Sequence, residues 1–167
     1  MQPMGGGPHT AGVYQPTVRR ATMFKKLLVP VDGSPTSKAA LMTAIDMAKV
    51  LGASMTVVSV YDPFPFIVAG PDYGYAQMQY VDAVRTETKN TVDAARKLAA
   101  DAGLTVEGLV VDASKTWRAI LDTVQGTASD LIVMGSHGRS GLDKLVMGSV
   151  AQSVLQHSPV AVLVVRG

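Results

Sequence analysis

Three glycines and a serine near the end of the chain have the spacing of an anion-binding segment. The residues are Gly135, Gly138, Gly148 and Ser149, in a stretch that follows an apolar strand and leads into a helix. Glycine lets backbone amides approach a ligand closely, and the N-terminus of a helix favours negative charge. The pattern therefore predicts a phosphate site. Any one of these glycines alone is more typical of a turn or a helix boundary.

The composition excludes other kinds of site. The chain has no cysteine, and its three histidines (His9, His137 and His157) are too scattered for a metal cluster, so we expect no metal bound by protein ligands. Four of the 15 basic residues precede Asp32, the first of 13 acidic ones, so the rest of the chain is slightly acidic. Without a clustered basic face, a nucleic-acid partner is not expected.

The chain carries no apolar run long enough to cross a bilayer, and its first residues lack the apolar stretch of a secretory signal. We therefore expect a cytoplasmic protein that has no membrane partner. Residues 1–22 are rich in glycine and proline and are predicted to be a flexible N-terminal extension. Met23, just before the first predicted strand, is a candidate start codon. Residues 23–167 are predicted to form one domain.

Apolar runs and helical patterns alternate along this domain. Strands are predicted at 26–31, 55–60, 105–111, 130–134 and 160–165, and helices at 35–51, 81–102, 117–124 and 148–156. Ser34 and Ser114 are the candidate caps of the first and third helices. Residues 61–80, which contain prolines, glycines and aromatics, are predicted to form a long irregular loop. This order predicts a doubly wound α/β fold of the Rossmann-like type, a five-stranded parallel sheet with helices on both faces.

Ligands of such sheets bind beyond the carboxyl ends of the strands, where the strand order reverses. If the first and fourth strands are neighbours, the segments 30–32 and 134–139 face each other across that crevice. The end of the second strand, at Val60, would lie beside them.

The glycine segment resembles a family signature, G-x-x-G-x9-G-[S/T], the nucleotide-binding motif of the universal stress proteins. Gly135, Gly138, Gly148 and Ser149 match it in full. The resemblance covers the chain from Phe24 to Arg166 and includes the sequence Val-Pro-Val-Asp-Gly-Ser at the end of the first strand. It places the chain with the members of the family that keep the motif and bind ATP, and it implies that residues 23–167 form a universal stress protein-like nucleotide-binding domain.

The resemblance implies roles for particular residues. Pro30, Asp32 and Val60 would contact the adenine and ribose, and Met134 and Gly135 would lie against the nucleoside. The phosphates would be held by residues of the glycine segment. The implied site comprises Pro30, Asp32, Val60, Met134, Gly135, Ser136, His137, Gly138, Arg139, Gly148, Ser149 and Val150. Mg2+ or Mn2+ would be held mainly by the phosphates.

The implied function is that of a small ATP-binding stress-response or signalling module with slow hydrolysis or none. A nucleotide-dependent ligase or transferase that uses the same crevice is the alternative, and a flavodoxin-like carrier is disfavoured because the glycine segment follows the fourth strand. Family members commonly dimerise through the last strand, so a homodimer through Val160 to Val165 is expected, with a further protein partner that the sequence does not identify.

Three side chains have simpler interpretations. Asp32 is of a type that also caps turns, and this role is compatible with ligand contact. His137 is interpreted as a loop histidine and not as a general base, because no carboxylate is evident to orient it. Ser140 lacks the G-x-S-x-G context of a nucleophile, since residue 142 is leucine.

Overall fold

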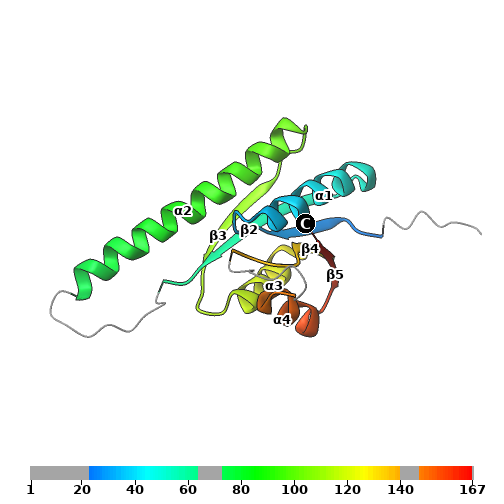
Figure 1. Cartoon of the computed structure of the whole chain (residues 1–167). Coiled ribbons are helices and arrows are strands. Elements are labelled where there is room, and N and C mark those ends of the chain that lie inside the picture. The colour runs from blue at the N-terminus through cyan, green and yellow to red at the C-terminus, as the bar shows by residue number, and fades with distance from the viewer. Residues whose placement is uncertain (1–22, 64–72, 140–146, 167) are drawn as a thin grey trace, which may run out of the picture.

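The centre of the molecule is a five-stranded parallel sheet (Figure 1). The computed structural model describes residues 23–63, 73–139 and 147–166. The strands lie in the order β3-β2-β1-β4-β5. Along the chain they are β1 (Lys26–Pro30), β2 (Ser54–Tyr61), β3 (Glu107–Asp112), β4 (Leu131–Gly135) and β5 (Ala161–Val165). The predicted extension over residues 1–22 lies outside the described residues.

Helices cover both faces of the sheet. They are α1 (Pro35–Leu51), α2 (Tyr73–Asp101), α3 (Thr116–Thr127) and α4 (Ser149–His157). Successive side chains of a strand point to opposite faces, so Leu27 of β1 packs in the core under α1 and α2 while Leu28 packs in the core under α3 and α4. This arrangement confirms the predicted doubly wound α/β fold.

The first strand and helix form as the sequence predicts. Ser34 caps α1, because its Oγ accepts the backbone N–H of Ser37 at 3.2 Å. Pro35 occupies the first turn, where its missing N–H costs nothing. The helix ends at Gly52, which has a φ of 64° and so adopts the left-handed conformation that favours glycine.

The prediction of an irregular loop through Tyr80 is wrong for residues 73–80, because α2 already begins at Tyr73. Residues 75–80 have the sequence YAQMQY, which contains neither proline nor glycine and includes good helix formers. Gly74 falls in the first turn. The remainder of the predicted loop, residues 64–72, lies outside the described residues.

The predicted cap of α3 is also wrong. Lys115, not Ser114, is the N-cap residue, and no side chain caps the helix among the described residues. The first hydrogen bonds of the helix run from the backbone N–H groups of Arg118 and Ala119 to the carbonyl of Lys115. Ser114 therefore lies one residue too early to act as the cap.

The strand order places the reversal point between β1 and β4. The register pairs Leu27 with Leu131 and Leu28 with Ile132, so these two strands are direct neighbours. The chain leaves β1 toward β2 and β3 and later returns to the other side of β1. The loops that follow β1 and β4 therefore flank a crevice. None of the helices in the described parts of the chain is long and apolar enough to cross a membrane.

Candidate functional site

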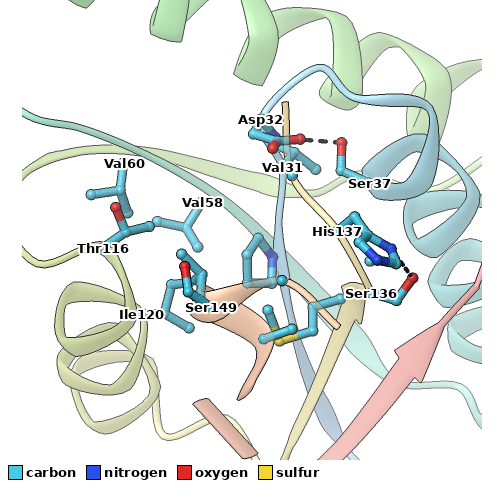
Figure 2. A pocket seen from close by; sticks show the side chains of 17 residues that line it. Val31, Asp32, Ser37, Val58, Val60, Thr116, Ile120, Ser136, His137 and Ser149 are labelled. Atoms are coloured by element: carbon cyan, nitrogen blue, oxygen red, sulfur yellow. Dashed lines mark hydrogen bonds between the residues drawn. The ribbon is translucent and has the colours of Figure 1, made fainter. Parts of the chain in front are cut away.

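A pocket lies at the carboxyl ends of β1, β2 and β4 (Figure 2). Eleven of the twelve residues predicted for the site line it, and only Arg139 is not among its lining residues. The eleven are Pro30, Asp32, Val60, Met134, Gly135, Ser136, His137, Gly138, Gly148, Ser149 and Val150. Residues more than a hundred positions apart in the sequence therefore meet in one cavity.

One side of the pocket is apolar. Val58 and Val60 come from the same face of β2, and Ile120 comes from the first turns of α3. Figure 2 shows these side chains on the same side of the pocket as Ser149. With Pro30 and Met134 they form a surface that suits a flat apolar ring.

Six further residues line the pocket and were not predicted: Val31, Ser37, Val58, Thr116, Ile120 and Ala151. Two signals in the sequence point to some of them. Val58 precedes Val60 by two and so shares its face of the strand. Thr116 and Ile120 are four residues apart in a helix that follows the carboxyl end of β3, at the same edge of the sheet as the pocket.

The N-terminus of α4 opens into the pocket. Its N-cap is Gly148, which makes no side-chain cap hydrogen bond within the described chain. The backbone N–H groups of the first turn, on Ser149, Val150 and Ala151, have no partner within the helix by virtue of their position. All three residues line the cavity. This end of the pocket therefore presents backbone donors and the positive end of the helix dipole.

The loop after β1 is fastened to the segment after β4. The carboxylate of Asp32 accepts the backbone N–H of Ser34 at 3.0 Å through Oδ1 and the backbone N–H of Arg139 at 3.1 Å through Oδ2. Thr36 Oγ1 donates to the carbonyl of His137 at 2.6 Å. The turn-capping interpretation of Asp32 is therefore confirmed, and each carboxylate oxygen keeps a lone pair for another donor.

The three glycines of the motif meet different neighbours. A Cβ at Gly135 would lie 2.8 Å from the backbone carbon of Thr36 and 2.9 Å from the backbone nitrogen of Ser37. At Gly138 it would meet Asp32 Oδ2 at 2.9 Å, and at Gly148 the carbonyl oxygen of Ser136 at 3.3 Å. Gly135 is thus needed for the packing of β4 against α1. Gly138 and Gly148 allow the segments around the pocket to lie close together.

His137 is held by its neighbour and not by an acid. Its Nδ1 lies 2.9 Å from Ser136 Oγ, a hydrogen bond drawn in Figure 2. Its Nε2 is buried and has no hydrogen-bond partner among the described residues. No carboxylate orients the ring in this part of the chain, so the geometry of a general base is not assembled here.

Arg139 leaves the pocket and reaches α2. Its guanidinium Nη2 lies 2.8 Å from Oε1 of Glu87, and both side chains are more than half exposed. Among the described residues, those that line the pocket include no lysine or arginine. Across the described residues, no group of three or more His, Asp and Glu side chains could hold a metal ion.

Comparison with known proteins shows the family. The model of the universal stress protein family matches residues 23–166. Over 86% of this chain, the sequence is 32% identical both to a universal stress protein of Thermus aquaticus and to universal stress protein YxiE of Bacillus subtilis, in each case across the whole of the relative. This chain belongs to the universal stress protein family.

Solved structures agree with this fold. The universal stress protein UspA from Lactobacillus plantarum superposes with a TM-score of 0.75 at 25% identity, over 85% of this chain and 97% of that one. The universal stress protein from Archaeoglobus fulgidus in complex with dAMP has the same fold, with a TM-score of 0.56 at 21% identity. The match covers 86% of this chain and 98% of that one. A family member from Arabidopsis thaliana with AMP bound matches with a TM-score of 0.59 at 16% identity, over 84% of this chain and 90% of that one.

Proposed function

We propose that this chain is an ATP-binding universal stress protein, a cytoplasmic nucleotide-dependent module of stress response or signalling with slow hydrolysis or none. One observation carries the proposal: the uncapped N-terminus of α4 and the apolar side formed by Val58, Val60 and Ile120 face the same cavity. An adenine nucleotide has the matching two parts, a flat ring and an anionic tail.

The residues of the pocket fit the two ends of the nucleotide. The adenine would lie against Val60 and Pro30, and Asp32 Oδ1 or Oδ2 would accept from the ribose. The phosphates would be held by the amides of Gly138 and of the first turn of α4, with the Ser149 hydroxyl as a further donor. Because the described residues give the pocket one carboxylate and no cluster of metal ligands, Mg2+ or Mn2+ would be bound mainly by the phosphates.

The same residues supply little for cleavage of the nucleotide. Phosphoryl transfer needs a group that orients the attacking water, whereas His137 is bonded to Ser136 through Nδ1 and its other ring nitrogen, Nε2, is buried. We therefore infer turnover well below one per second. Release of phosphate at several turnovers per second by the purified protein would contradict this part of the proposal.

The relatives support the ligand class. The protein from Archaeoglobus fulgidus was solved with dAMP and the one from Arabidopsis thaliana with AMP, both in this fold. The glycine motif at Gly135, Gly138 and Gly148 favours the triphosphate for this chain. A second copy of the chain, paired along β5, is the expected partner.

The binding claim is tested by extracting nucleotides from protein purified without added ATP and identifying them by mass spectrometry. Val60→Trp would fill the apolar side of the pocket, whereas Val110→Trp places the same ring on the exposed edge strand β3, away from the lining residues. We expect ATP in extracts of the wild type and of Val110→Trp and none from Val60→Trp. No adenine nucleotide in the wild-type extract, together with no binding of added ATP, would overturn the proposal.

A further inference from the structure

We propose that Glu87 of α2 holds Arg139 outside the pocket and that the outer phosphates of a bound nucleotide take Arg139 from it. By competing for Arg139, Glu87 would then reduce the preference of the pocket for triphosphate over monophosphate. The inference rests on the proposed nucleotide binding and adds to it a residue on α2 that lies outside the glycine motif.

The placement of Arg139 is the first observation. It directly follows Gly138, which lines the pocket, and its backbone N–H is fixed on Asp32 Oδ2 at 3.1 Å. The start of its side chain is therefore held beside the pocket, while the guanidinium extends to Glu87 at 2.8 Å. Because 65% of the side chain is exposed, little packing holds it in this orientation.

The charge of the pocket is the second observation. In the part of the chain that the structure describes, its lining contains the carboxylate of Asp32 and no lysine or arginine. Backbone amides and the helix dipole can hold one phosphate at the N-terminus of α4, but each further phosphate adds negative charge in a cavity that already contains an anion. Arg139 is a cation whose backbone lies beside that cavity.

The competition between the two partners favours the phosphates. The side chain of Glu87 is 58% exposed, and an ion pair in such surroundings is weak. A guanidinium binds phosphate oxygens through two parallel hydrogen bonds, and these are strengthened by the full charge of the tail. A monophosphate held at the start of α4 offers fewer oxygens within reach of Arg139, so Arg139 strengthens its binding less.

The exchange has a consequence for α2. The Arg139–Glu87 pair joins the segment after β4 to the middle of α2, and α1 and α2 also flank a groove whose lining includes Glu87, Lys38 and Asn90. Transfer of Arg139 to a nucleotide would leave Glu87 at the rim of this groove without its cation. Triphosphate binding would thus change the charge of a surface outside the nucleotide pocket.

The experiment measures the dissociation constants of ATP and AMP by calorimetry at fixed Mg2+ for four proteins: wild type, E87Q, R139Q and the double variant. E87Q releases Arg139, so the affinity for ATP should rise about two- to five-fold, which is the range expected for the loss of an exposed ion pair. The affinity for AMP should stay unchanged. R139Q should lower the affinity for ATP and leave the affinity for AMP unchanged. In the double variant the effect of E87Q should disappear, because no arginine remains to be released.

Asp93→Asn is the matched control. Asp93 also lies on α2, is 50% exposed and pairs with Arg96 at 3.9 Å, so the variant removes the same charge from the same helix. It should leave the ratio of ATP to AMP affinity unchanged. An unchanged ratio in E87Q, or a gain that persists in the double variant, would overturn the inference while leaving ATP binding intact. Failure of the wild type to bind either nucleotide would overturn the proposed function as well.

Discussion

The carboxylate of Asp32 accepts the backbone N–H of Arg139 at 3.1 Å, although the two residues are 107 positions apart. The bond joins the loop after β1 to the segment after β4, which are the two sides of the crevice at the reversal point of the sheet. The other oxygen of the same carboxylate accepts from Ser34. One side chain therefore sets the shape of both loops.

The variant Asp32→Asn tests this role. An amide can offer only one acceptor to the two N–H donors, so the free energy of unfolding should fall by about 1–2 kcal/mol. Affinity for ATP and AMP should fall several-fold, because the second loop is released and the carboxylate is lost. Urea unfolding and calorimetry measure the two effects.

Asp130→Asn is its control. Asp130 accepts the backbone N–H groups of Lys25 and Lys26 at 2.8 and 3.0 Å, the same double arrangement, and it does not line the pocket. We expect a similar loss of stability with unchanged nucleotide affinity. Equal nucleotide affinity in Asp32→Asn and the wild type would contradict the role given to Asp32.

The sequence predicts most of this site because its signals are local. The glycines, Pro30 and Asp32 stand at the ends of apolar runs, and parallel strands bring such ends to one edge of the sheet. Ile120 and Thr116 were missed because their place depends on how α3 packs against α4. The direction of the Arg139 side chain could not be predicted either, since it depends on a glutamate in a helix whose first turns were themselves predicted as loop.

The substitution Gly135→Ala should damage the fold more than the site. A Cβ there would press on backbone atoms of Thr36 and Ser37 at 2.8–2.9 Å, and backbone cannot move aside as a flexible side chain can. We expect a loss of about 1–3 kcal/mol of unfolding free energy, measured by denaturant unfolding.

Gly126→Ala is the matched control for that change. Gly126 lies in α3, and a Cβ at this position would have no atom of the described chain within 4 Å, apart from its chain neighbours and the backbone of its own helix. Alanine should therefore be neutral or stabilise the helix by up to about 1 kcal/mol. Equal stability of Gly135→Ala and the wild type would show that β4 and α1 are not packed as described.

Pairing through β5 is expected to make a homodimer. The strand lies at one edge of the described sheet. The carbonyl of Val165 accepts the N–H of Ser136, so by alternation the backbone groups of Val164 point away from β4. An exposed apolar edge of this kind invites pairing with another strand.

Light scattering at micromolar concentration should therefore report a dimer for the wild type. Val164→Pro, which removes the outward N–H and is tolerated at an edge, should give a folded monomer by circular dichroism and light scattering. A monomeric wild type would rule out the pairing.

If the N-terminus of α4 holds the phosphates, a negative charge placed there should weaken ATP binding, and calorimetric titration of ATP into Ser149→Glu measures this effect. A carboxylate in the first turn favours the helix dipole but would repel phosphates in the pocket. Gln152→Glu adds the same charge one turn later, on an exposed residue outside the lining. We predict that Ser149→Glu lowers ATP affinity at least ten-fold at wild-type stability while Gln152→Glu binds as the wild type does; equal affinity in the two variants would show that the phosphates are not held at the N-terminus of α4.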